Sequence, residues 1–271
     1  MLKDLHTLTP YLDFIRTCNA DPDYRDPMLL TQQQLHRNLL DAPENPNTRV
    51  FGTFEGEAIT GVFALLVLED ERYLELLAGL SRSAAAYAEL LSHLKSAHPG
   101  YQADFVYNPR NRLLQEALAA LGAEFEPEQQ KLVLCRAVPY VPDARIVPYR
   151  PEYRAQYLAL HTVDRYWTGE KVLAAPEVFR VLLALEAGEA AGYIDLTHNS
   201  TENEPYDLFV REKSRRRGLG RALLAAAVQE NRPNSMTLLV DIDNEAAIAL
   251  YEAQGFERAD GENNITAHIC L

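Results

Sequence analysis

The sequence is poor in cysteine, and its cysteines do not form a metal-binding pattern. Cys18, Cys135 and Cys270 stand far apart in 271 residues, with no CxxC pair and no neighbouring histidine that would complete a zinc site. An odd number of scattered thiols makes no disulfide framework, so we expect a reducing compartment, the cytoplasm. The seven histidines show no ligand spacing, and we expect His161 and His198 to be surface or hydrogen-bonded side chains. No metal is predicted.

The sequence also lacks an apolar run of membrane-spanning length. Its first fourteen residues contain Asp4 and Asp13, so no signal peptide is expected either. Positive charge is scarce, because 26 Lys and Arg oppose 39 Asp and Glu and leave a net charge of −13. An acidic chain repels nucleic acid and anionic membranes, so neither is an expected partner. With 47% hydrophobic and 24% charged residues, the chain is typical of a folded protein rather than a disordered, collagenous or coiled-coil one.

A weak internal repeat is present. Asn111 to Gly122 frames an apolar-periodic helix, and Asn244 to Gly255 frames a second helix of the same length. The offset between the two asparagines is 133 residues. Chance similarity between helices is the alternative explanation. The same offset aligns two further stretches without a gap, 82–91 with 215–224 and 102–108 with 235–241.

The repeat predicts two domains of related fold. We place them at residues 1–138 and 145–271, with a linker at 139–144 whose prolines favour extended backbone. Both copies alternate strand-like and helix-like segments, which predicts the α/β class with a mixed sheet. In the second copy the expected strands are 145–149, 179–185, 190–197, 206–210 and 236–242, and the expected helices are 151–162, 217–231 and 244–254. In the first copy a hairpin is expected at 54–58, and helices are expected after Ser83 and Arg110.

The scarce cations are concentrated in one short segment. It lies between an apolar strand and an Ala/Leu-rich helix, so Gly218 and Gly220 mark a turn that exposes backbone N–H groups. A helix N-terminus flanked by guanidinium groups is suited to phosphate, and this order of elements favours that interpretation over a solvated basic turn. The P-loop and GxGxxG patterns are absent, and the segment is too compact for a nucleic-acid surface. Its six cations, within eleven residues, are Arg211, Lys213, Arg215, Arg216, Arg217 and Arg221.

Two motifs resemble the GNAT N-acetyltransferase superfamily. Arg215-Arg-Arg-Gly-Leu-Gly220, five residues after a strand that ends at Val210, is similar to the family's Arg/Gln-x-x-Gly-x-Gly/Ala loop. Asn244-Glu-Ala-Ala-Ile-Ala-Leu-Tyr-Glu-Ala-Gln-Gly-Phe256 is similar to its Asn-x-x-Ala-x-x-Leu-Tyr-x-x-x-Gly-Phe segment. The two motifs occur in the family's order and spacing. The narrower resemblance is to members that acetylate protein N-termini, such as the ribosomal-protein alanine N-acetyltransferases.

The resemblance implies a fold and a cofactor. The fold is two tandem GNAT-like domains, each a mixed, mostly antiparallel twisted sheet flanked by helices and splayed where acetyl-CoA enters. Acetyl-CoA is the implied acyl donor, a primary amine the acceptor, and a backbone N–H of Phe209 or Val210 the oxyanion donor. The implied cofactor contacts are Leu208, Phe209 and Val210 along the pantetheine, Arg215, Arg216, Arg217, Gly218, Leu219, Gly220 and Arg221 at the pyrophosphate, and Asn244 and Ala247 beside the arm.

The resemblance also implies that Tyr251 is the general acid. The departing thiolate needs a proton, and a phenol with a pKa of about 10 is protonated at pH 7. The alternative is a tyrosine that only packs in the core. The base stays open, because Leu239 stands where members with N-terminal acceptors often carry Glu. Glu204 and Asp207 are the nearest carboxylates, and Asp241 and Asp243 follow Leu239. The alternative for each is a solvated strand-end or helix-capping charge, and a water relay or a neutral acceptor would remove the need for a base.

The first copy lacks the cofactor features. At the offset of 133 residues, the two glycines and the tyrosine are replaced by Ala85, Tyr87 and Leu118. Side chains at the first two positions should block the phosphate turn, and leucine cannot donate a proton. We therefore expect a first domain that binds no CoA and is structural or forms part of the acceptor site. Tyr166 and Trp167, in a loop that often lines the acceptor pocket in the family, are candidate acceptor contacts, and a packing anchor is the alternative for Trp167.

The acceptor and one alternative function remain open at this level. A small-molecule amine, an antibiotic and a protein N-terminus all fit, and the acidic surface favours a cationic acceptor. The alternative function is a non-catalytic acyl-CoA-binding regulatory or interaction module. Leu239 favours that alternative, whereas Tyr251 disfavours it. The sequence indicates no particular oligomeric state.

Overall fold

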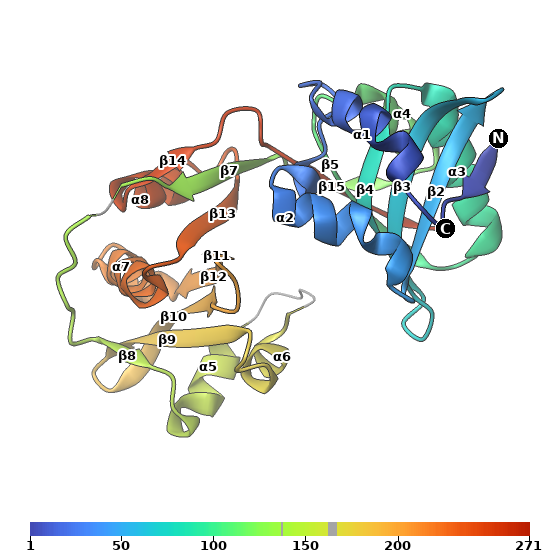
Figure 1. Ribbon diagram of the computed structural model, residues 1–271. Coiled ribbons are helices and arrows are strands. Elements are labelled where there is room, and N and C mark those ends of the chain that lie inside the picture. The colour runs from blue at the N-terminus through green and yellow to red at the C-terminus, as the bar shows by residue number, and fades with distance from the viewer. Residues whose placement is uncertain (137, 162–166) are drawn as a thin grey trace. The chain divides into compact units, whose positions relative to one another are not determined.

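The computed structural model describes residues 1–136, 138–161 and 167–271 (Figure 1). These residues form two compact units, one that joins Met1–Gln130 with Asp260–Leu271 and one that comprises Lys131–Ala259. Both contain sheets flanked by helices, and the predicted α/β class with mixed, mostly antiparallel sheets is confirmed. In the ranges that the structure describes, no helix is long and apolar enough to cross a membrane.

The first unit is built on a seven-stranded sheet with the order β1-β2-β3-β4-β5-β15-β6. Its pairs are antiparallel except β4 and β5, which run parallel from Tyr73 and Gln102 to Leu76 and Phe105. The strands are β1 (Leu2–Asp4), β2 (Thr48–Glu55), β3 (Ala58–Leu68), β4 (Tyr73–Ser81), β5 (Gln102–Tyr107), β6 (Glu124–Phe125) and β15 (Ile265–Cys270). The helices are α1 (Leu12–Asn19), α2 (Gln32–Leu35), α3 (Ala84–Ala97) and α4 (Arg112–Ala120), with a π-helical turn at His36–Leu40 and 3₁₀ turns at Thr9–Tyr11, Pro27–Leu29 and Ala42–Glu44.

Helices cover both faces of this sheet. α3 and α4 pack with Leu76 on one face, and α1 packs with Ala78 on the other. The face changes within β4 because Leu76 pairs with Leu65 while Ala78 pairs with Ala64, which leaves one extra residue in β4. Such a bulge reverses which side chains point to each face.

The second unit contains two four-stranded sheets, ordered β12-β10-β9-β8 and β11-β13-β7-β14. α7 lies between them, since its apolar side chains share one core with residues of both sheets. α5 packs on the opposite face of β9 and β10, where Tyr157 contacts Tyr193. The strands are β7 (Gln129–Leu134), β8 (Ile146–Pro148), β9 (Phe179–Glu186), β10 (Glu189–Thr197), β11 (Glu202–Asn203), β12 (Pro205–Val210), β13 (Ser235–Asp241) and β14 (Phe256–Arg258). The helices are α5 (Arg154–Leu160), α6 (Gly169–Ala174), α7 (Leu219–Asn231) and α8 (Glu245–Ala253), with 3₁₀ turns at Pro151–Tyr153 and Glu212–Ser214.

The two repeats exchange their last strands (Figure 1). β7, from the first repeat, lies in a sheet of the second unit, and β15, from the second repeat, lies in the sheet of the first unit. β7 lies between β13 and β14, and β15 lies between β5 and β6. The units therefore depart from the contiguous domains expected at 1–138 and 145–271, because residues 131–136 belong to the second unit and 260–271 to the first. A sequence offset locates the copies of a repeat, but backbone pairing decides in which sheet a strand lies.

Two neighbouring strands of the second unit separate from each other. β11 pairs in parallel with β13, through Glu202 with Ser235 and Asn203 with Met236. β12 begins at Pro205, directly after β11, but it pairs with β10 and is the edge strand of its sheet. β12 and β13 therefore start side by side and then belong to different sheets, which is the splay that the resemblance implied.

Candidate active site

The free edge of β12 directs backbone N–H groups away from its sheet. Arg211 donates its N–H to the carbonyl of Ala191 at 2.8 Å, and the register then pairs Val210 with Gly192 and Phe209 with Tyr193. Because antiparallel ladders alternate, the Phe209 N–H points to β10 and the N–H groups of Leu208 and Val210 point to the free edge. The geometry therefore selects Val210 over Phe209 as the candidate oxyanion donor.

Gly192 permits the close approach of β10 and β12. A Cβ added at Gly192 would lie 2.6 Å from the backbone oxygen of Phe209, which is closer than any real contact. Any other residue would push β12 outward and change the direction of the N–H groups on its free edge. The position of the candidate oxyanion donor thus depends on a glycine in the neighbouring strand.

The basic turn at residues 211–218 ends in a helix with an open N-terminus. Gly218 is the N-cap residue of α7, with φ of 80° and no side-chain cap. A Cβ at Gly218 would meet no atom within 4 Å, so glycine is required here by backbone conformation and not by protein packing. The N–H groups of Leu219, Gly220 and Arg221 have no partner within the helix and carry the positive end of its dipole. Arg216 also has a positive φ of 61°, an uncommon backbone conformation for a residue other than glycine.

The cations of this turn are held at its rim. Arg215 donates Nε–H to the carbonyl of Val210 at 3.0 Å, which ties the turn to the end of β12. Arg217 lies 3.4 Å from Glu186, and the hydroxyl of Ser214 and the charge of Arg217 hold the pKa of Glu186 below its usual range. Arg215, Arg216, Arg217 and Arg221 are all exposed, so their guanidinium groups are accessible to an anion.

The second motif forms α8. Asn244 is its N-cap, and its side chain accepts the N–H of Ala247 at 3.2 Å. Tyr251 is 9% exposed and packs edge-on against Phe256, with the ring centroids 5.8 Å apart. The ring of Tyr251 is therefore part of the core, and its proposed acid role concerns only the hydroxyl group.

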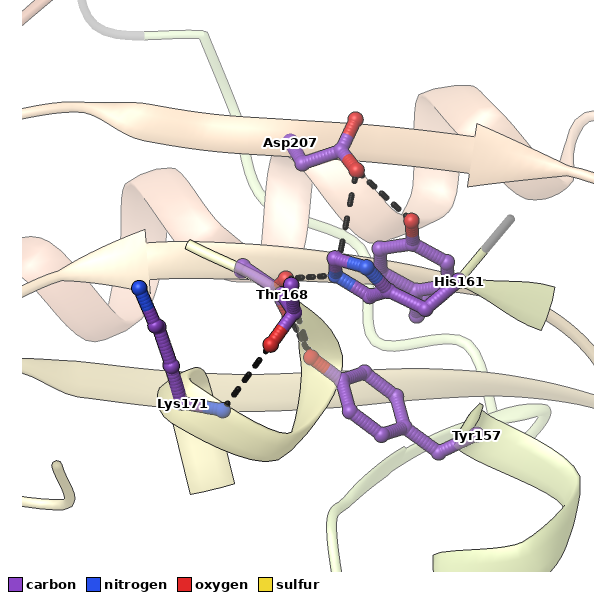
Figure 2. A network of polar contacts seen from close by, with 7 residues as sticks. Tyr157, His161, Thr168, Lys171 and Asp207 are labelled. Carbon is purple, nitrogen blue, oxygen red and sulfur yellow. Dashed lines mark hydrogen bonds and ion pairs between the residues drawn. The ribbon is translucent and has the colours of Figure 1, made fainter. Parts of the chain in front are cut away.

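A buried network that the sequence did not reveal lies on the other face of β10 and β12 (Figure 2). His161, which follows α5, places Nε2 at 2.9 Å from Asp195 and 3.9 Å from Asp207. The two carboxylates are register partners on β10 and β12. Tyr157 donates its hydroxyl to both oxygens of Asp195 at 3.0 Å, and Tyr193 donates to Asp207 at 2.6 Å.

The members of this network differ in access to solvent. The side chain of Asp195 is fully buried and that of His161 is 3% exposed, whereas Asp207 is 14% exposed. Burial raises the pKa of Asp195, and the hydrogen bond with His161 opposes that rise. Burial also raises the pKa of Tyr157, so its hydroxyl stays protonated and donates. The spacing of His161 and the two carboxylates is not by itself evidence for a metal.

The structure also describes two other candidates, Glu204 and Trp167. Glu204 precedes β12, and its carbonyl accepts the backbone N–H of Thr197 while its own N–H donates to the Thr197 hydroxyl. Burial, followed by the charge of Glu202, raises the pKa of Glu204. Trp167 packs edge-on against Phe179, in an apolar cluster that includes Tyr206. Tyr166 lies outside the described residues.

Among the two sequence-predicted base candidates, the structure places Asp207 in a polar network with a histidine. No sequence motif predicts the contact of His161 with Asp195, because His161 follows α5, Asp195 lies on β10, and the two meet only where α5 packs on that strand. The signal that was available is Asp195 itself, a single aspartate among the apolar residues of a strand that is buried from Ala190 to Leu196.

The corresponding helix start in the first unit is closed. Ser83, not Ala85, is the N-cap of α3, so the offset of 133 residues does not hold there, and its hydroxyl caps the N–H of Ala86. Tyr87 is fully buried, donates to the carbonyl of Ser81 at 3.1 Å, and accepts from Asn111 at 2.8 Å. The turn is thus filled by the chain's own side chains.

The comparisons with known proteins agree with this geometry. Residues 177–258 match the family model described as an acetyltransferase (GNAT) domain, and they lie entirely within the second unit. The second unit is therefore similar to a GNAT acetyltransferase domain over these residues. No curated protein matches the sequence of this chain.

Solved structures show that the fold is shared over both units. A GCN5-related N-acetyltransferase from Sphaerobacter thermophilus aligns with a TM-score of 0.65 at 14% identity, over 100% of this chain and 95% of that one. A tandem GNAT protein from the clavulanic acid biosynthesis pathway aligns with a TM-score of 0.56 at 16% identity, over 100% and 98%. A putative acetyltransferase from Pyrococcus horikoshii aligns with a TM-score of 0.58 at 11% identity, over 100% and 89%. At these identities the likeness concerns the fold.

Proposed function

We propose that the second unit transfers the acetyl group of acetyl-CoA to a primary amine. The observation that carries the proposal is the course of one free strand edge. The edge of β12 carries the outward N–H groups of Leu208 and Val210, and it is followed by the uncapped N-terminus of α7 at Gly218. An extended pantetheine arm pairs with such an edge, and a pyrophosphate binds at such a helix start.

The proposed binding roles follow from these positions. The N–H groups of Leu219, Gly220 and Arg221 take the pyrophosphate, with the exposed arginines of the turn at its rim. The Val210 N–H polarises the thioester carbonyl and stabilises the oxyanion of the tetrahedral adduct. Asn244 and Ala247 border the arm, and Tyr251 reaches the sulfur from α8.

The proposed chemistry uses two protein groups. An ammonium acceptor loses one proton to Asp207, and the free amine attacks the thioester carbonyl carbon. The C–S bond breaks with its electron pair on sulfur, and the thiolate takes a proton from Tyr251. The second N–H proton of the adduct restores the Tyr251 hydroxyl, and Asp207 releases its proton to water. The products are an amide and the CoA thiol. The negative charge at Asp207 favours an acceptor that arrives as a cation.

Calorimetry with acetyl-CoA tests the binding part. The Gly218→Glu variant places a carboxylate and a strained backbone at the proposed phosphate site, so we expect its affinity to fall about tenfold or more. Gly188→Glu is the matched control, because Gly188 also has a positive φ, of 83°, and an open Cβ position in the same unit. Equal affinity of the two variants, or no binding by the wild type, contradicts the proposal.

Release of the CoA thiol tests the transfer. The panel consists of spermidine, glucosamine, kanamycin and a peptide with an N-terminal alanine, which span the acceptor classes that the sequence leaves open. We expect at least one amine to accelerate thiol release by the wild type. Binding of acetyl-CoA without acceleration by any of them would instead support a non-catalytic acyl-CoA-binding module.

A further inference from the structure

We propose that His161 and Asp195 are positioning residues for deprotonation of the acceptor, which hold one proton beside Asp207 and thereby keep Asp207 a carboxylate. This inference rests on the proposed function, because it assigns a task to the buried groups behind the proposed base. In this arrangement Asp207 meets the acceptor, because its side chain is 14% exposed, against 3% for His161 and none for Asp195.

The geometry orients the histidine toward both carboxylates. Tyr157 and the Nε2 of His161 together contact Asp195 from the α5 side, at distances between 2.9 and 3.0 Å. The ring of His161 is stacked on Tyr193 with an angle of 15° between planes and 4.8 Å between centroids. The ring is therefore fixed in plane and direction, and its Nε2 faces Asp207 at 3.9 Å.

The network holds two acidic side chains and one basic side chain, His161. Two carboxylates meet as register partners, and in the part of the chain that the structure describes, the ion pairs of both are with His161. The titratable groups that face them are Tyr157 from α5 and Tyr193 from β10, and both donate hydrogen bonds without charge. Figure 2 also shows Lys171 of α6, whose backbone N–H donates to the hydroxyl of Thr168 at 3.4 Å.

One proton lowers the electrostatic cost of this network. Two ionised carboxylates without a cation are costly at a buried site, and the usual response is that one of them takes up a proton. If His161 is an imidazolium, with a proton on each ring nitrogen, its charge balances Asp195, and Asp207, the member that reaches solvent, stays ionised. If His161 could not hold it, the proton would go to a carboxylate, and Asp207 would lose its capacity to accept a proton from the amine.

The second nitrogen of His161 makes its charge depend on the carboxylates. Nδ1 is buried and has no hydrogen-bond partner in the described structure. In the imidazolium, Nδ1 is an N–H donor, and a buried donor without a partner costs free energy. The charge on His161 therefore depends on the two carboxylates at Nε2, which have to outweigh that cost. Here the chain leaves Nδ1 unpaired and places two carboxylates at Nε2.

The test is the pH dependence of kcat/KM for acetyl transfer to the best amine of the panel above. His161→Gln keeps an N–H donor but cannot carry charge, so we expect the acidic limb of the profile to move up by about one pH unit or more. At pH 7 kcat/KM falls about tenfold, while the KM for acetyl-CoA is unchanged. Asp195→Asn removes the neighbouring negative charge, and its acidic limb moves to lower pH.

The double variant His161→Gln/Asp195→Asn distinguishes a charge effect from damage to the fold. It removes the cation and one anion together, so we expect its acidic limb to return to within about half a pH unit of the wild type. His268→Gln is the matched control, because His268 also lies between two carboxylates, Asp104 at 2.7 Å and Glu126 at 3.2 Å, but in the first unit. Its profile should superimpose on that of the wild type.

The outcomes separate the two proposals. Superimposable profiles for the wild type and both single variants overturn the positioning role, as does a double variant that does not return. If His161→Gln fails to fold, the downward shift of Asp195→Asn still decides, and no shift in that variant overturns the inference. A wild-type chain that transfers acetyl to no amine of the panel contradicts the proposed function itself and takes this inference with it.

Discussion

Asp26 accepts a hydrogen bond from the backbone N–H of Gly79 at 2.6 Å, in the first unit. Its other oxygen accepts the N–H of Met28 at 2.8 Å, and the turn Pro27–Leu29 contacts both β4 and β5. β4 and β5 pair only as far as Leu76 and Phe105, so Gly79 lies where they have separated. In the second unit the corresponding separation leaves strand N–H groups free, whereas in the first unit a buried carboxylate occupies it.

This difference predicts one acetyl-CoA per chain. The first unit has a filled strand gap at Asp26 and a capped helix start at Ser83, so it offers neither the strand edge nor the phosphate site. We expect a calorimetric stoichiometry near one with the wild type. Gly218→Glu should leave no residual site of comparable affinity. A stoichiometry near two, or one intact site in that variant, would show that the first unit binds the cofactor.

The buried Asp26 predicts a pH-dependent stability. Burial raises the pKa of Asp26 to about 7 from 3.8, against the opposing hydrogen bonds from Gly79 and Met28. Because the folded pKa exceeds the unfolded one, this group's contribution is fully present below about pH 4 and is lost as the pH rises through about 7. The slope is at most about 1.4 kcal/mol per pH unit.

Urea unfolding of the wild type and Asp26→Asn between pH 5 and 8 measures this effect. We expect the difference in free energy of unfolding between them to change in favour of the variant as the pH rises, because the asparagine does not ionise. Asp23→Asn, at an exposed carboxylate nearby, is the control and should keep the wild-type dependence. A constant difference between the wild type and Asp26→Asn would refute the assignment.

Tyr251→Phe separates the acid from the packing role of this side chain. Phenylalanine keeps the edge-on contact with Phe256, so the melting temperature should change little. Loss of the hydroxyl should lower kcat by about tenfold or more, with acetyl-CoA affinity unchanged in calorimetry. Tyr101→Phe, in the first unit, is the control. An unaltered kcat in Tyr251→Phe would show that another group protonates the thiolate.

The features that sequence reasoning located correctly are local ones. Asn111 and Asn244 are both helix N-caps that accept a backbone N–H three residues on, and Gly122 and Gly255 both have positive φ after the helices. The position of Gly218 at the start of α7 also agrees with the motif. Such caps and turns depend on a few neighbouring residues, so a pattern in the sequence is enough to identify them.

The features that it missed depend on partners far along the chain. The exchange of β7 and β15 is a choice between two sheets, and both choices satisfy the same alternation of side chains. The helix expected after Ser83 is confirmed, but the offset of 133 residues placed the equivalent of Gly218 at Ala85, whereas the N-cap is Ser83 and Tyr87 closes that turn through Ser81 and Asn111. In each case packing or pairing decided between alternatives that the sequence left equal.

The sequence by itself determined the class of fold and the glycine turn at the start of α7, because glycines and caps act over a few residues. Only the tertiary structure decided which carboxylate is the candidate base. His161 and Asp195 are 34 residues apart, and they meet Asp207 through the pairing of β10 with β12. Burial then favours uptake of one proton by this group of side chains, because two buried carboxylates repel each other more strongly than two exposed ones.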